Sequence, residues 1–222
     1  MSTYLRRRGR LTRAQARALD AFADGVIVAE DTAGPVDWTE RFGRAAPLGV
    51  EIGFGMGQAL LDWAQSAPEM NLIGIDVYQP GIGSLLKGRA EHGIEHLMVV
   101  EGEADAAVGS LFATDSLTEA RIFFPDPWPK KRHHKRRLIN GPFVERLAAR
   151  LAPGGRLRLA TDWEDYALSM LEVLEAEPAL ANAAGSGFAE RFPGRSVTRF
   201  EARGQRLGHR VWDLCFLRIP QR

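Results

Sequence analysis

The stretch Glu51-Ile52-Gly53-Phe54-Gly55-Met56-Gly57 decides the fold, because it joins an apolar run that begins at Leu48 to a helix-forming segment that begins near Gln58. Glycines at alternate positions allow positive φ angles and let backbone amides approach a ligand that a Cβ atom would exclude. The dinucleotide fingerprint G-x-G-x-x-G would place its third glycine where the chain has Gln58. The stretch therefore predicts a strand, a ligand-binding turn of another kind and a helix. A generic tight strand-to-helix turn is the alternative.

The same succession of a short apolar run and a helix-forming segment recurs along the chain. The apolar runs are Leu48–Gly53, Leu72–Asp76, Leu97–Glu101, Arg121–Pro125 and Arg156–Thr161. Helices are expected near residues 57–66, 80–92, 104–112, 141–151 and 163–176. Strands that alternate with helices predict a parallel sheet with helices on both faces. After Phe188, Val197–Phe200 and Arg210–Ile219 follow each other without a helix, which predicts an antiparallel hairpin at one edge.

The composition is that of an ordinary soluble globular protein, since 45% of the 222 residues are hydrophobic and 26% are charged. No run of about 18 residues is both apolar and free of charge, so a transmembrane helix is not expected. Asp20 and Asp24 interrupt the segment after the Arg-rich N-terminus, which makes it a poor secretory signal. Cys215 stands alone and cannot form an internal disulfide, so a reducing cytoplasm is the expected location.

Two blocks of the chain carry bases without acids. Residues 1–17 contain six Arg, and residues 129–137 contain six Lys and Arg, while acids outnumber bases in the rest of the chain. Cations gathered in this way predict a polyanionic partner, whereas a solvated tail or loop is the alternative for either block alone. Residues 1–30 are expected to form a basic extension with a helix capped by Thr12, and residues 31–222 a single domain.

Acids follow the first three predicted strands, at the end where an open parallel sheet binds its ligands. Glu51 suits a ligand with an ammonium group, because a carboxylate would repel a pyrophosphate. Asp76 stands where an acid accepts hydrogen bonds from both hydroxyls of a ribose. Glu103 can accept from an adenine amino group, with Asp105 as a competing candidate that can also serve the helix dipole. Ammonium, ribose and adenine together describe S-adenosylmethionine, whereas a nicotinamide dinucleotide offers only the last two.

A further acid, Asp126, lies between two prolines in Phe123-Phe124-Pro125-Asp126-Pro127-Trp128-Pro129. The prolines preset the backbone, so the carboxylate is positioned at low entropic cost and can accept from the N1–H and amino group of guanine. Trp128 can stack on such a base, and the basic run that follows reads as a clamp for phosphates. The alternative is an ordinary Asp-Pro turn with a packed Trp.

Two more acids stand in conspicuous places. Asp162 ends the fifth predicted strand beside Trp163, where capping of the next helix is the alternative to a role in binding. Glu201 is the one acid between residues 191 and 210, a segment that contains several Arg. Binding of a base edge would explain an acid in such a basic segment. The five histidines do not occur with acids or cysteine at metal-ligand spacing, so no metal site is expected.

With these motifs in hand, the chain resembles the bacterial tRNA (guanine-N7-)-methyltransferase family over nearly its whole length. The motifs that carry the resemblance are TYLRRRGRLTRAQ, EIGFGMG, FFPDPWPKKRHHKRR, ATDWEDYA and VTRFEARGQRLGHRVWDL. The resemblance implies the class I methyltransferase fold, a Rossmann-like α/β fold with a seven-stranded, mostly parallel sheet and an antiparallel edge hairpin. It also implies S-adenosylmethionine as the cofactor, tRNA as the partner, and the variable-loop guanosine as the target, giving 7-methylguanosine.

The resemblance also implies a role for individual residues. The expected cofactor contacts are Glu51, Gly53, Gly55, Gly57, Asp76, Glu103 and Asp126, and Asp126 is also the expected catalytic acid. The expected contacts to the substrate guanosine are Lys130, Asp162, Thr198, Arg199, Phe200 and Glu201. The expected contacts to RNA are Arg132, His133, His134, Lys135, Arg136 and Arg137. The chain departs from the family's usual pattern at Glu103, where Asp is more common, and at Arg199, where Lys is more common.

Guanine N7 has a lone pair and no proton to lose, so its methylation needs no general base at that atom. Catalysis is expected to come from alignment, with Asp126 orienting the base and stabilising the positive charge that develops on the purine. The alternatives are a methyltransferase for another RNA site or a small molecule, a non-catalytic RNA-binding protein, and a dinucleotide oxidoreductase, which Glu51 and Gln58 disfavour. The sequence leaves open whether the chain is a monomer or a homodimer.

Overall fold

The structure is a computed structural model that describes residues 10–195, 201 and 210–220. These residues form two compact units, one ending at Ala113 and the other beginning at Thr114. The expected separation of residues 1–30 from a single domain over residues 31–222 stays a prediction. None of the helices in the described ranges has the length and hydropathy that a membrane crossing requires.

The N-terminal unit is built on a parallel sheet in the order β1–β4–β3–β2. The strands are β1 (Ile27–Ala29), β2 (Leu48–Ile52), β3 (Asn71–Asp76) and β4 (Leu97–Glu101). The helices are α1 (Arg13–Phe22), α2 (Trp38–Phe42), α3 (Gln58–Ser66), α4 (Gln79–Glu91) and α5 (Ala104–Ser110). Nearly every residue of β2, β3 and β4 is buried, as expected for parallel strands covered on both faces.

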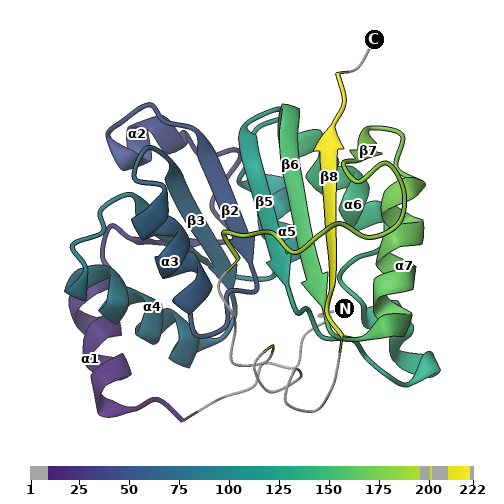
Figure 1. Ribbon diagram of the computed structural model, residues 1–222. Coiled ribbons are helices and arrows are strands. Elements are labelled where there is room, and N and C mark those ends of the chain that lie inside the picture. The colour runs from purple at the N-terminus through teal and green to yellow at the C-terminus, as the bar shows by residue number, and fades with distance from the viewer. Residues whose placement is uncertain (1–9, 196–200, 202–209, 221–222) are drawn as a thin grey trace. The chain divides into compact units, whose positions relative to one another are not determined.

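Helices α1, α3 and α4 share one hydrophobic core with the strands beneath them (Figure 1). Leu60 of α3, Leu85 of α4 and Leu72 of β3 are completely buried in it. Helix α1 begins where the sequence predicts, because the Thr12 side chain accepts a hydrogen bond from the Gln15 backbone in a capping box. The core therefore fixes the helices that follow β2 and β3, and with them the turns at the strand ends.

The C-terminal unit is built on a mixed sheet in the order β5–β6–β8–β7. Strands β5 and β6 are parallel, whereas β8 is antiparallel to both β6 and β7. The strands are β5 (Leu117–Phe123), β6 (Leu151–Thr161), β7 (Leu180–Asn182) and β8 (Trp212–Arg218). The helices are the 3-10 helix η1 (Lys131–Arg136), α6 (Gly141–Arg150) and α7 (Glu164–Glu175). In Figure 1, residues 183–195 run without helix or strand across β8, β6 and β5.

The five predicted strand–helix units are all present, and the prediction differs from the structure only in where some of these elements begin and end. Strand β5 begins at Leu117 instead of Arg121, and β6 begins at Leu151 instead of Arg156. Strands β1 and β7 and helix α2 were not predicted, because three to five residues show no periodicity. The predicted strand Val197–Phe200 lies outside the described residues. The antiparallel edge is nevertheless present, and β7 supplies the partner of β8.

Candidate functional site

The glycine turn after β2 adopts the backbone that its sequence predicts. Gly53, Gly55 and Gly57 have φ angles of +74°, +57° and +83°, and Gly57 is the N-cap of α3. A Cβ atom added at Gly53 or Gly55 would meet no other atom within 4 Å. The backbone at Gly53 and Gly55 therefore faces open space, where a ligand can approach it more closely than a side chain would allow.

Asp76, at the end of β3, holds this turn through its carboxylate. Its Oδ2 accepts a hydrogen bond from the Gly55 backbone at 2.8 Å, and its Oδ1 accepts from Val77 and Tyr78 at 2.7 and 2.9 Å. Sequence reasoning assigned Asp76 to a ribose and missed this structural role.

Gly81, in the first turn of α4, permits the glycine turn to pack against that helix. A Cβ atom at Gly81 would lie 1.8 Å from the carbonyl oxygen of Gly55, a separation that no side chain can adopt. Sequence reasoning also missed this residue. The available signal was the glycine inside a predicted helix, which costs stability and so indicates a close backbone contact.

Glu51, Asp76 and Glu103 lie at the carboxyl ends of β2, β3 and β4, or directly beyond them. These strands are parallel neighbours, so the three acids share one edge of the sheet. Glu51 is only 3% exposed. Glu103 is half-buried as the N-cap of α5, while Asp105 is exposed in the first turn of that helix. The structure thus brings together the acids of the predicted cofactor site.

Glu30, which sequence reasoning missed, fastens the start of α5. Its carboxylate accepts a hydrogen bond from the Glu103 backbone N–H. A Cβ atom at Gly102 would come within 2.3 Å of the Glu30 Cβ, so the approach depends on that glycine. The contact fixes the backbone of Glu103 and thereby the position from which its side chain extends.

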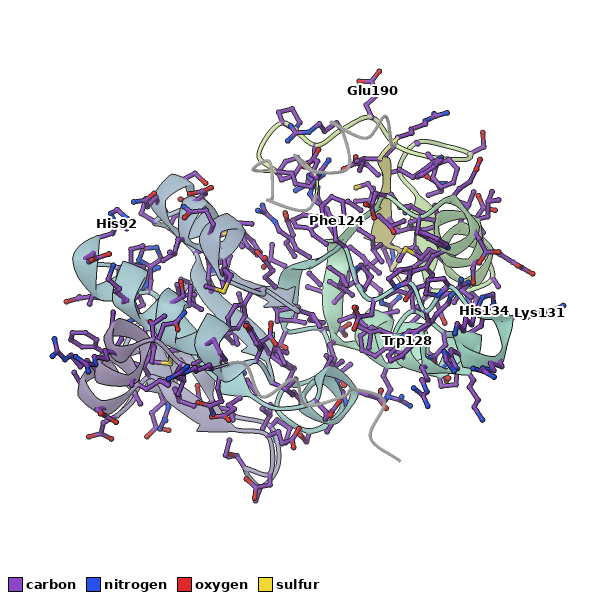
Figure 2. The ribbon with its side chains drawn as sticks, turned by 90° about the horizontal axis from the view of Figure 1, so that it is seen from below. His92, Phe124, Trp128, Lys131, His134 and Glu190 are labelled. Carbon is purple, nitrogen blue, oxygen red and sulfur yellow. The ribbon has the colours of Figure 1, made fainter. Side chains whose placement is uncertain are left out.

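In the C-terminal unit, Asp126 is exposed on a turn bracketed by strained residues. Phe124 and Trp128 have φ angles of +52° and +46°, values that residues other than glycine rarely adopt. The Trp128 ring packs against the guanidinium of Arg136 at 5.0 Å and meets the His133 ring edge-on at 6.0 Å. Trp128 is therefore held by residues of the 3-10 helix that follows it. Figure 2 labels Trp128, Lys131 and His134 in this part of the unit.

The side chains of the basic run, residues 130–137, differ in their exposure to solvent. Lys130, Lys131, Arg132, Lys135 and Arg136 are exposed, and His133 and His134 are half-buried. Partial desolvation and the neighbouring cations, Arg136 first among them, lower the pKa of His133, which keeps its ring neutral at pH 7. Figure 2 shows Lys131 extending outward at the edge of this unit.

Arg137 corrects one prediction, because it is buried instead of facing RNA. The residue is 5% exposed, pairs with Asp165, and donates from Nε to the carbonyl oxygen of Pro127 at 3.0 Å. Its guanidinium also lies 4.7 Å from the centroid of the Tyr166 ring. These contacts occupy the planar face and edges of the group, so Arg137 as placed cannot reach a phosphate.

Glu201 is a second correction. The residue is completely buried, and Arg195 donates to its Oε1 and Oε2 at 3.1 and 2.5 Å. The same guanidinium donates to Asp213 of β8 at 2.9 and 3.1 Å. The ion pair with Arg195 thus explains the isolated acid, and Glu201 as placed does not face a base. Thr198, Arg199 and Phe200 lie outside the described residues.

Asp162 is half-buried directly after β6, and Trp163 beside it is 38% exposed. Helix α7 begins at Glu164 with Trp163 as its N-cap, and the Trp163 backbone donates to the Thr161 hydroxyl at 3.2 Å. The turn is therefore made by Thr161, which weakens the alternative that Asp162 serves as the helix cap. In the described ranges, no three His, Cys, Asp or Glu side chains gather as metal ligands would.

The glycine turn and the three acids fit S-adenosylmethionine on structural grounds. The open space over Gly53 and Gly55 admits a ligand close to the backbone. The buried carboxylate of Glu51 and the edge position of Asp76 match an ammonium group and a ribose, respectively. The N-terminal unit therefore has the parts that this cofactor requires.

Comparison with known proteins finds a family model and several curated relatives that match this chain. Residues 45–214 match the family model described as "Putative methyltransferase". A tRNA (guanine-N(7)-)-methyltransferase of Paracidovorax citrulli is 48% identical over 99% of this chain and 87% of its own length. The enzymes of that name from Burkholderia thailandensis and Bordetella pertussis are each 49% identical, over 96% and 97% of this chain and 80% and 84% of their own lengths.

Solved structures agree on the fold. The 16S rRNA methyltransferase KamB superposes with a TM-score of 0.58 at 16% identity, over 88% of this chain and 99% of that chain. A 16S rRNA (adenine(1408)-N(1))-methyltransferase of Catenulisporales acidiphilia gives 0.56 at 17% identity, over 84% and 92%. These likenesses confirm the α/β fold of class I methyltransferases. The identity to the curated relatives, which extends over most of both chains, shows that this chain belongs to the family of tRNA (guanine-N(7)-)-methyltransferases.

Proposed function

We propose that this protein transfers a methyl group from S-adenosylmethionine to N7 of a guanosine in tRNA, giving 7-methylguanosine. The observation that carries the proposal is the arrangement of Glu51, Asp76 and Glu103 at one edge of the sheet around an open glycine turn. The relatives that are 48–49% identical to this chain bear the name of that activity.

Each acid has a distinct part in holding the methyl donor. Glu51 pairs with the ammonium group, Asp76 accepts from the ribose hydroxyls, and Glu103 accepts from the adenine amino group. At Gly53 and Gly55 the cofactor can approach the backbone without meeting a side chain. When bound, S-adenosylmethionine supplies a methyl group on a positively charged sulfur. The protein's task at this site is to hold that methyl group in one orientation.

The guanosine is oriented by the C-terminal unit. The exposed carboxylate of Asp126 accepts from the N1–H and amino group of guanine, and Lys130 and Asp162 contact the same nucleoside. Because N7 carries a lone pair, no residue has to remove a proton from it. Asp126 instead aligns the base and stabilises the positive charge that grows on the purine ring.

The exposed cations of the basic run contact the tRNA phosphates. Arg132, Lys135 and Arg136 present their charges to solvent, as phosphate contacts require. The proposed target is the guanosine of the variable loop, and the proposed compartment is the cytoplasm, where tRNA is available.

The test is to incubate the protein with S-adenosylmethionine and an unmodified tRNA transcript and to identify the nucleosides by mass spectrometry. The expected product is 7-methylguanosine from the variable loop, and a transcript with adenosine at that position should yield none. Another methylated nucleoside would support a methyltransferase for a different RNA site. Binding of tRNA without any methylation would support a non-catalytic RNA-binding protein.

A further inference from the structure

The acid-free run from Lys130 to Arg137 contains two kinds of cation. All eight residues are described, and Arg137 is the one that is buried. Its guanidinium is shielded from solvent, while the five other Lys and Arg side chains of the run are exposed. A run that served only to contact phosphates would gain nothing from burying its last arginine, so Arg137 needs a different explanation.

The contacts of Arg137 connect the turn that carries Asp126 to helix α7. On one side, Nε donates to the carbonyl oxygen of Pro127, the residue that follows Asp126, at 3.0 Å. On the other side, Nη2 pairs with Asp165, and the guanidinium lies over the Tyr166 ring at 4.7 Å. One planar group thus joins the backbone next to Asp126 to two residues of the first turn of α7.

On the helix side, Arg137 has one buried aromatic partner and one ionised partner. Tyr166 is completely buried, and its hydroxyl accepts from the Ile139 backbone at 3.1 Å. Burial raises the pKa of Tyr166, so its hydroxyl stays protonated. The hydrogen bond from Arg137 lowers the pKa of Asp165, so its carboxylate stays ionised at neutral pH. Arg137 is therefore attached to a fixed anchor.

The turn needs such an anchor. Phe124 and Trp128, on either side of Asp126, both have positive φ angles. Residues in that conformation persist only where their surroundings hold them in place. Between them, Pro127 has a carbonyl oxygen whose partner is the Arg137 guanidinium. A lysine could not replace Arg137, because a point charge cannot make these contacts in two directions while stacking on a ring.

We infer that Arg137 is a positioning residue that fixes the carboxylate of Asp126 for guanine and makes no contact with RNA. The inference rests on the proposed function, in which Asp126 orients the base. Because Arg137 acts on the geometry of the reaction, its loss should lower the rate of methyl transfer while leaving the binding of the tRNA phosphates intact.

The first test compares Arg137→Lys with Lys135→Ala, which alters an exposed neighbour in the same run. The measurements are the single-turnover methylation rate at saturating tRNA and the slope of log affinity for tRNA against log salt. Arg137→Lys should lower the rate on the order of 10- to 100-fold with an unchanged slope. Lys135→Ala should lower the slope by roughly 0.7–0.9, as expected for one lost phosphate contact. A lowered slope in Arg137→Lys, or a wild-type rate, would overturn the inference.

The second test asks whether Arg137 acts through Asp126. In an Asp126→Asn background, Arg137→Lys should cause no further fall in the single-turnover rate, because the group that it positions is already gone. Equal falls in both backgrounds would show a general structural effect and would refute the inference. A wild-type rate in Asp126→Asn alone would instead refute the proposed role of Asp126, and the positioning role with it.

A third variant protects the test against misfolding. Asp165→Asn removes the charged partner of Arg137 from a side chain that is 62% exposed, so this variant should fold. Its single-turnover rate should fall by less than that of Arg137→Lys, with wild-type salt dependence. If Arg137→Lys does not fold and Asp165→Asn keeps the wild-type rate, the inference is wrong.

Discussion

Arg195 binds both carboxylate oxygens of Glu201, and neither side chain is exposed to solvent. Asp213 shares the same guanidinium, and Arg191 donates from Nε to Oε1 of Glu201 at 3.4 Å. A buried guanidinium between two carboxylates is costly to disturb, because removal of one partner leaves the other charges buried without compensation.

Replacement of Arg195 by Met should therefore destabilise the protein by about 3–5 kcal/mol at neutral pH. Burial already raises the pKa of Asp213, and loss of the cation would raise it further. The folded variant would then hold a proton that the unfolded chain releases, so its stability should fall as the pH rises from the ordinary pKa of a carboxylate, about 4, to the raised pKa of Asp213. Urea unfolding at several pH values measures this, and a loss of stability that is independent of pH would contradict the account.

Gly81→Ala should weaken the binding of S-adenosylmethionine by about tenfold, because its Cβ would force the Gly55 carbonyl to move. Gly83→Ala is the matched control in the same helix. Its Cβ would lie 2.8 Å from the Gln15 carbonyl of α1, away from the turn. Calorimetric titration of both variants should show a loss of affinity for Gly81→Ala alone, and similar affinities would count against the role of Gly81.

The glycine turn and the buried ion pairs show why the sequence predicts one part of the protein and not another. The turn from Gly53 to Gly57 was predicted, because alternating glycines dictate positive φ angles locally. The partners of Arg137 and Glu201 were not, because burial of a charged residue depends on contacts with other elements such as Asp165 and Asp213. No local sequence pattern within the run of cations distinguishes the buried Arg137 from its exposed neighbours.

The same distinction applies to acids at strand ends. The parallel pairing of β2, β3 and β4 places Glu51, Asp76 and Glu103 at one end of the sheet, and the alternation of strands and helices predicts this parallel arrangement. The backbone contacts of Asp76 depend on how the glycine turn folds back onto β3, which a residue pattern does not specify.

Asp165→Asn should lower stability at neutral pH and have no effect in acid. Arg137 holds the pKa of Asp165 below its ordinary value, so the carboxylate stabilises the fold above that ordinary pKa. This contribution is lost as the pH falls through the lowered pKa of the folded state. Because the Asp165 side chain is 62% exposed, the effect should be below about 1 kcal/mol. Unfolding at neutral and acidic pH measures it, and an equal difference at both would indicate packing instead of charge.

Lys135 and Arg136 replaced together by Ala should weaken tRNA binding and reduce its salt dependence, while the affinity for S-adenosylmethionine stays unchanged. Both side chains are exposed, so each can release a counterion on contact with a phosphate. Titration of tRNA at several salt concentrations tests this. An unaltered slope would mean that the run is only a solvated surface, and the Arg-rich segment before Thr12 would then be the next candidate for RNA contact.

The central claim, methylation of guanine at N7, is tested most directly by a tRNA that carries 7-deazaguanosine at the variable-loop position. This base replaces N7 by a C–H group and keeps the N1–H and amino group that Asp126 is proposed to bind. The protein should bind this tRNA as it binds the unmodified transcript, and methylate only the latter. Transfer of a methyl group to that 7-deazaguanosine would place the reaction at another atom and contradict the account.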